Sequence, residues 1–139
     1  TLPAVRRTGF RWPGLLAAPV LVVPYVDPTA YVERYSEPDK AASGLGGSTD
    51  DWTVPYWWVD GGAAVMAMLV AAEAHGLGAL FFGQFGHEGP VAARLGVPEG
   101  RRAVGTVALG HPVAGRGGAG RSAGRGRPGA DLHVRRGAW

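Results

Sequence analysis

The chain has 139 residues, of which 46% are hydrophobic and none is cysteine. This length fits a single domain, and the lack of cysteine excludes disulfides, a thiolate nucleophile and metal centres held by thiolates. The net charge of +3 is uneven, because residues 1–100 hold six basic and ten acidic side chains whereas residues 101–139 hold eight arginines and one aspartate. A basic C-terminal segment is typical of a phosphate or nucleic-acid partner, or of a solvated tail.

The N-terminal half of the chain predicts one strand and one short helix. Residues 1–16 are expected to form a loop or a frayed end. The continuous apolar run at 18–26 is typical of a strand buried on both faces. Asp27 and Pro28 predict a helix start, with the aspartate as its cap and the proline in its first turn. Residues 36–51, rich in Gly, Ser and Asp, are expected to form a loop.

A long apolar helix is predicted next, over residues 61–75, with Asp60 as its cap. Its small and apolar side chains lie on nearly every face, which favours a central helix or one at a subunit interface. Residues 76–78, Gly-Leu-Gly, are expected to end it. A short extended segment at 79–82 and a flexible loop at 83–89 should follow.

The rest of the chain predicts a second helix and a second buried strand before its composition changes. A proline starts the predicted helix at 90–95, and the strand is expected at 103–109. After residue 112 the sequence is rich in Gly and Arg. The longest apolar stretch, 61–82, is interrupted by a glutamate, a histidine and glycines, so we expect a soluble protein without a membrane span.

Several kinds of chemistry receive little support from the sequence. The four histidines lack the two-histidine helical spacing of zinc hydrolases, and no serine lies in a G-x-S-x-G turn. Residues 115–122 match a phosphate-binding loop with arginine in place of lysine, but the residues after them cannot open a helix, so chance explains the match. The Arg- and Gly-rich tail also has the composition of segments that bind single-stranded nucleic acid.

Aromatic side chains gather between residues 52 and 58. The four members of this group are Trp52, Tyr56, Trp57 and Trp58. Such rings can stack on a planar ligand, and they can equally pack in a hydrophobic core.

Five short motifs occur in order along the chain. They are A-P-V-L-V-V at 18–23, D-G-G-A-A at 60–64, G-L-G at 76–78, L-G-V-P-E at 95–99 and L-G-H-P at 109–112. In this order and spacing they resemble the flavin-dependent nitroreductase family across residues 17–112. Residues 17–112 would then form the family's core, followed by a basic segment at 113–139.

The resemblance implies an α+β fold, with a central and mostly antiparallel sheet wrapped by helices. It further implies a cytoplasmic homodimer with FMN at the subunit interface. NAD(P)H would reduce the flavin, and a nitro, quinone or similar small-molecule acceptor would take the electrons. Because the cofactor carries the chemistry in such enzymes, the resemblance also accounts for a sequence without a nucleophile, metal ligands or an acid–base pair.

The resemblance also implies cofactor-binding residues. They are Phe81, Phe82, Gly83, Gln84, Arg125 and Arg127. A backbone N–H near Gly83 would be directed at the flavin N5, and the lack of a side chain would let the backbone approach closely. The two arginines, in the segment R-G-R-P, would bind the FMN phosphate with their guanidinium groups. The alternative for the two phenylalanines is that they are ordinary core residues.

One motif of the family is not found where it is expected. Family members begin with a helix that carries R-[ST]-x-R, well before the first strand. Residues 6–11, R-R-T-G-F-R, lie too close to the strand at 18–23 to serve in that role. We therefore expect that the N-terminal part of the subunit is missing and that this chain alone binds FMN poorly. The alternative function is a protein without enzymatic activity whose basic tail binds nucleic acid.

Overall fold

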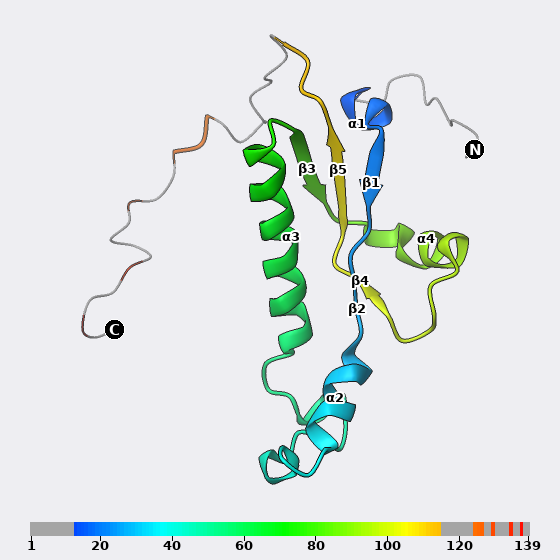
Figure 1. Ribbon diagram of the computed structural model, residues 1–139, viewed down its shortest axis with the longest axis vertical. Coiled ribbons are helices and arrows are strands. Elements are labelled where there is room, and N and C mark those ends of the chain that lie inside the picture. The colour runs from blue at the N-terminus through cyan, green and yellow to red at the C-terminus, as the bar shows by residue number, and fades with distance from the viewer. Residues whose placement is uncertain (1–12, 115–123, 127–128, 130–133, 135–136, 138–139) are drawn as a thin grey trace.

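The computed structural model describes residues 13–114, 124–126, 129, 134 and 137 (Figure 1). The helices are α1 (Pro13–Ala17), α2 (Pro28–Ser36), α3 (Tyr56–Ala74) and α4 (Glu88–Leu95), with short 3-10 turns η1 (Ala41–Ser43), η2 (Thr49–Asp51) and η3 (Phe85–His87). The strands are β1 (Val20–Val22), β2 (Tyr25–Val26), β3 (Gly78–Phe82), β4 (Arg102–Ala103) and β5 (Thr106–Gly110). The class is therefore α+β, as the sequence predicts.

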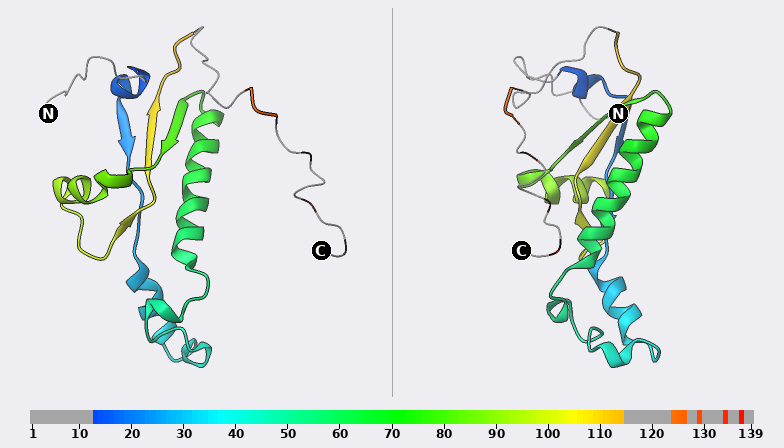
Figure 2. Two further views of the ribbon diagram at one scale, coloured as in Figure 1. Left: turned by 180° about the vertical axis from the view of Figure 1, so that it is seen from behind. Right: turned by 90° about the vertical axis from the view of Figure 1, so that its left-hand side faces the viewer.

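Strand β5 is the centre of a three-stranded antiparallel sheet with the order β1-β5-β3. Its residue Ala108 pairs with Leu21 on one side and with Leu80 on the other. The side chain of Val107 in this strand is completely buried. Strands β2 and β4 form a separate antiparallel pair. Helix α3 packs along one face of the sheet, and α4 lies on the other side of the strands (Figure 2).

The strand expected at 18–26 is divided in two. Pro24 separates β1 from β2, and its carbonyl oxygen accepts a hydrogen bond from the Val104 amide. A proline has no N–H to donate to a sheet, so continuous pairing ends there. Val20 and Leu21 are exposed, so the prediction of a strand buried on both faces is wrong. The strand expected at 103–109 is divided as well, into β4 and β5.

The ends of the helices confirm part of the sequence analysis. The Asp27 carboxylate accepts a hydrogen bond from the Thr29 amide at 3.1 Å, and Pro28 is the first residue of α2. Helix α3 ends at Ala74 and is followed by Gly76, which has a left-handed backbone, and the Leu77 amide donates to the Ala72 carbonyl. This hydrogen bond and the left-handed glycine form the glycine-dependent end that the sequence predicts.

Three other boundaries differ from the predictions. Residues 13–16, expected as loop, belong to α1. Helix α3 begins at Tyr56, and Asp60 lies inside it instead of capping it. Its carboxylate accepts a hydrogen bond from the Tyr31 hydroxyl. The loop expected at 83–89 already contains η3, and α4 begins at Glu88, two residues before the expected start.

An aromatic cluster fixes the beginning of α3. Trp52 and Trp57 are buried beside Val26, and Tyr31 and Tyr35 of α2 pack against them. The rings meet edge to face, with centroids of Trp52 and Tyr35 at 4.7 Å, a geometry that aromatic quadrupoles favour. Burial of Trp57 outweighs the low helix propensity of its aromatic neighbours, so the helix starts earlier than the glycines suggest.

Gly61 allows α3 to pack closely on the strands. A Cβ atom at this position would lie 2.7 Å from side-chain carbons of both Val26 and Val104, whereas a Cβ at the neighbouring Gly62 would meet nothing within 4 Å. Both positions are inside the same helix. Replacement of either glycine by alanine therefore changes the helix propensity by the same amount, and the two variants differ only in packing.

We predict that Gly61→Ala is less stable than Gly62→Ala by about 1–3 kcal/mol, the cost of overpacking a core. Gly62→Ala itself should raise the free energy of unfolding by about 0.5–1 kcal/mol, because the unfolded chain loses conformational freedom. Urea unfolding of the two variants and the parent measures both values. Equal stability of the two variants would show that α3 does not pack on Val26 and Val104 as described.

None of the helices that the structure describes combines the length and the apolar character needed to cross a lipid bilayer.

Candidate functional site

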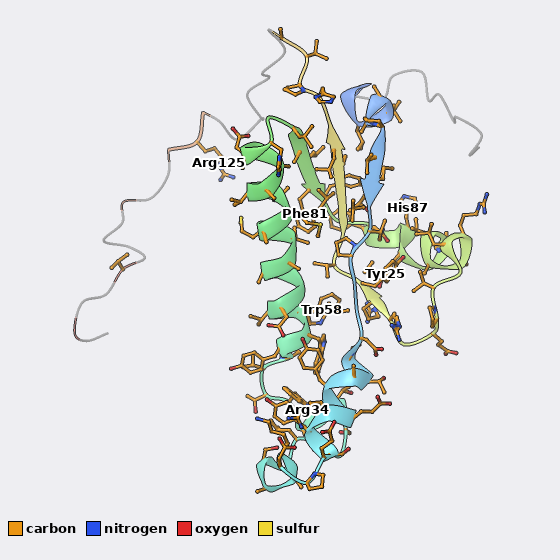
Figure 3. All side chains as sticks on the ribbon, viewed as in Figure 1. Tyr25, Arg34, Trp58, Phe81, His87 and Arg125 are labelled. Carbon is orange, nitrogen blue, oxygen red and sulfur yellow. The ribbon has the colours of Figure 1, made fainter. Side chains whose placement is uncertain are left out.

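The loop 83–87 joins β3 to α4 and contains two of the six residues predicted to bind a cofactor (Figure 3). Phe82, the last residue of β3, pairs with Thr106 of the central strand. The chain leaves the sheet at Gly83, which is exposed. Exposed backbone without a side chain can come close to a ligand, so the loop offers a surface for a planar molecule.

Phe85 has an unusual conformation in this loop. Its φ of 47° is the only positive value among the non-glycine residues that the structure describes. Its side chain is 90% exposed, and its ring lies against Gly83, where a Cβ atom would be 3.1 Å from the Phe85 Cζ. A left-handed backbone at a bulky residue costs free energy, so other contacts must impose it.

Gln84 connects the loop to the centre of the sheet. Its side-chain Nε2 donates a hydrogen bond to the hydroxyl of buried Thr106 at 3.0 Å. The other end of the amide, Oε1, is buried and has no hydrogen-bond partner among the residues described. The Tyr25 hydroxyl is also buried and has no hydrogen-bond partner among the residues described. A buried acceptor without a donor is unfavourable, and an enclosed water molecule would supply the missing donor.

Glu88 connects the other end of the loop to β4. Its Oε1 accepts from Arg102 Nε at 2.9 Å and from the Ala103 amide at 3.0 Å, and its Oε2 accepts from Arg102 Nη2 at 3.3 Å. These hydrogen bonds hold the pKa of Glu88 below its ordinary value, and the carboxylate raises the pKa of Arg102. The Arg102 guanidinium also lies over the ring of Trp58, 5.9 Å from its centroid.

We predict that the stabilisation from Glu88 depends on pH. The pKa of Glu88 is lower in the folded chain than its ordinary value of 4.5, so the stabilisation is complete above pH 4.5 and is lost as the pH falls through the folded pKa. Glu88→Gln should therefore cost about 1.5 kcal/mol at neutral pH and progressively less in acid. Denaturant unfolding of both proteins across this range measures the difference, and a constant difference would contradict the prediction.

The structure places the predicted cofactor residues in two groups. Phe81, Phe82, Gly83 and Gln84 lie together at the end of β3 because they are contiguous. Phe81 is 40% exposed, and its ring lies where a side chain at Gly105 would be. Arg125 is exposed and lies apart from Phe81 in Figure 3. Arg127 lies outside the described residues.

Of the four aromatic side chains at 52–58, two pack in the hydrophobic core and two are exposed to solvent. Trp52 and Trp57 are core residues, so they are not free to stack on a ligand. Tyr56 and Trp58 are exposed to solvent, and the ring of Trp58 carries the Arg102 guanidinium.

The residues that hold the loop carry no recognisable signal in the sequence. Glu88 stands out in the sequence only because it follows His87. No sequence pattern indicates that it pairs with Arg102, which lies 14 positions later. Thr106 is likewise unremarkable in a strand. The antiparallel pairing of β3 and β5 places Thr106 beside the start of the loop, and the packing of α4 on β4 places Arg102 beside Glu88. In the part of the chain that the structure describes, no three His, Asp or Glu side chains gather as they would around a metal ion.

The fold is α+β, and the loop 83–87 leaves exposed backbone at the end of β3. A planar organic group could approach the exposed Gly83 backbone closely, because no side chain stands in the way. The chain belongs to the nitroreductase family, because the family model described as "Nitroreductase family" matches residues 3–111. No curated protein matches the chain significantly. The family consists of oxidoreductases that typically use a flavin.

Proposed function

We propose that the protein is an FMN-dependent oxidoreductase that takes electrons from NAD(P)H and passes them to a nitro, quinone or similar small acceptor. The observation that carries the proposal is the loop 83–87, in which exposed Gly83 backbone adjoins an anchored Gln84. Membership of the nitroreductase family supports the same conclusion. FMN, when bound, would supply the hydride-accepting chemistry.

The residues of the loop would orient the cofactor. A backbone N–H near Gly83 would donate a hydrogen bond toward N5 and so fix which face of the ring receives the hydride. The half-exposed ring of Phe81 would give apolar contact beside it. The Gln84 amide, held by its hydrogen bond to Thr106, would keep the neighbouring Gly83 backbone in place for the ring.

The phosphate of FMN would be bound by arginines of the C-terminal segment. Arg125 and Arg127 can each present a guanidinium fork, which matches the geometry of a phosphate oxygen pair better than the point charge of a lysine. Riboflavin has the same ring system without the phosphate. A comparison of the two flavins therefore separates recognition of the phosphate from recognition of the ring.

We predict that Arg127→Ala in the full-length protein weakens FMN binding by about 1.5–3 kcal/mol, the scale of a hydrogen bond to a charged group, and leaves riboflavin binding almost unchanged. Fluorescence titration of both flavins measures the two affinities. The matched control is Arg94→Ala, because Arg94 is an exposed arginine on α4, outside the C-terminal segment. Equal losses for FMN and riboflavin would rule out the phosphate role. A loss of nucleic-acid affinity with each arginine removed would favour a nucleic-acid-binding tail instead.

We further propose a homodimer with FMN at its interface. Helix α3 buries Trp57, Gly61, Val65 and Ala72, whereas its opposite side exposes Val59, Met66 and Val70. Such a contiguous apolar face is typical of an interface between subunits. A molar mass in solution of one chain, measured by sedimentation with saturating FMN, would contradict the dimer.

A further inference from the structure

Both ends of the loop 83–87 are attached to the same short stretch of chain, residues 102–106. At the first end the Gln84 amide donates to the Thr106 hydroxyl at 3.0 Å. At the second end the Glu88 carboxylate, directly after the loop, accepts from Arg102 and from the Ala103 amide. We call these contacts the Gln84 clamp and the Glu88 clamp.

The two clamps have different physical strength. Thr106 is buried, so the hydrogen bond of the Gln84 clamp is shielded from competing water. The Glu88 clamp is charge-assisted and has two N–H groups of Arg102 on two carboxylate oxygens, a geometry that fixes direction as well as distance. Trp58 of α3 lies against Arg102, so this clamp also joins the loop to the long helix.

The loop between the clamps does not hold itself in place by packing. Phe85 is almost fully exposed and has a left-handed backbone, a conformation that persists only where surrounding contacts impose it. Within the loop, the His87 amide donates to the Gln84 carbonyl at 2.9 Å. The conformation of Gly83 and Gln84 therefore depends on the clamps at either end.

We propose that the Gln84 and Glu88 clamps are positioning devices that hold the Gly83 backbone for the flavin and thereby set its affinity and reduction potential. This inference rests on the proposed FMN site. Preorganised donors stabilise a ligand without the cost of ordering them when it binds. Glu88, Arg102 and Thr106 thus act on the cofactor through the loop and do not touch it.

The test replaces Glu88 by glutamine, which keeps the shape of the side chain and removes its charge. The matched control is Asp39→Asn, because Asp39 accepts two hydrogen bonds from Arg34 at 2.8 and 2.7 Å, the same chemistry at the far end of the molecule (Figure 3). Amide hydrogen exchange of the chain without flavin is measured first. We expect exchange in residues 83–87 to become about tenfold faster in Glu88→Gln, from the loss of a charged hydrogen bond, and to stay unchanged in Asp39→Asn.

The second measurement is the midpoint potential of FMN bound at saturating concentration. Loosening the loop weakens the donor near N5, so reduced FMN should lose about tenfold more affinity than oxidised FMN, which lowers the two-electron potential by about 30 mV. A role limited to fold stability would leave the potential of the bound flavin unchanged. Asp39→Asn should retain the parent value.

The outcomes separate this inference from the proposed function. Faster exchange with a lowered potential supports the clamps as positioning devices, and unchanged exchange or an unchanged potential overturns them. A full-length parent protein that binds no FMN overturns the proposed function and, with it, the flavin role of the clamps, whatever the exchange shows. If Glu88→Gln does not fold, Arg102→Lys replaces it, since lysine keeps the charge but loses the two-pronged contact. Faster exchange and a lowered potential in that variant would support the clamps, and an unchanged value of either would overturn them.

Discussion

Replacement of Trp52 by alanine should lower the free energy of unfolding by about 3–5 kcal/mol, the usual cost of removing a buried tryptophan. Trp52 meets the rings of Tyr31, Tyr35 and Trp57 edge to face, and its Nε1 donates to the Leu45 carbonyl at 3.0 Å. The substitution removes the rings' shared partner and leaves the carbonyl without its donor. The total free energy of unfolding of a domain is only about 5–15 kcal/mol. The loss should therefore lower the denaturant midpoint of unfolding strongly.

The matched control is Trp58→Ala, which removes the same side chain from an exposed position. It should cost about 1 kcal/mol, mainly through the lost contact with the Arg102 guanidinium. Urea unfolding followed by circular dichroism gives both values. Similar costs at the two positions would show that the aromatic cluster is not the core that joins α2 to α3.

Replacement of Gly83 by valine in the full-length protein should raise the Kd for FMN about 100-fold, equivalent to about 2.7 kcal/mol, while the fold is retained. A Cβ atom here would lie 3.1 Å from the ring of Phe85, and that ring is exposed and can move aside. The added side chain would instead stand between the backbone and the flavin. The rate of flavin reduction by NAD(P)H should fall with the binding.

The control for this prediction is Gly86→Val, three residues further along the same loop, where an added Cβ meets nothing within 4 Å. It should leave FMN binding near the parent value. Flavin titration and anaerobic reduction of each variant supply the comparison. If Gly83→Val binds and reduces FMN normally, the backbone at Gly83 does not contact the ring.

The sequence predicted most accurately where a local chemical rule decides the structure. Asp27 caps α2 because its carboxylate can reach the Thr29 amide within the same turn. Gly76 ends α3 because only the left-handed backbone of a glycine closes the helix without strain. The α+β class followed from ordered motifs, each of which is local as well.

The sequence failed where a long-range contact overrides a local preference. The glycine pair at 61–62 weakens a helix locally, yet α3 starts before it because Trp57 is buried and Gly61 is needed for close packing. In the candidate site, too, local features could be predicted from the sequence and long-range contacts could not. The residues at 81–84 could be found from a contiguous motif, whereas Glu88 and Arg102 become partners only once β4 lies beside α4.

Binding of FMN by the loop 83–87 can be measured by amide hydrogen exchange of the full-length protein with and without saturating FMN. We expect peptides covering residues 81–87 to become protected, because the flavin ring would cover the Gly83 backbone and order the loop. Peptides covering η1 and α2, at the far end of the molecule in Figure 1, should not change. Protection confined to other parts of the chain, or none at 81–87, would contradict the claim.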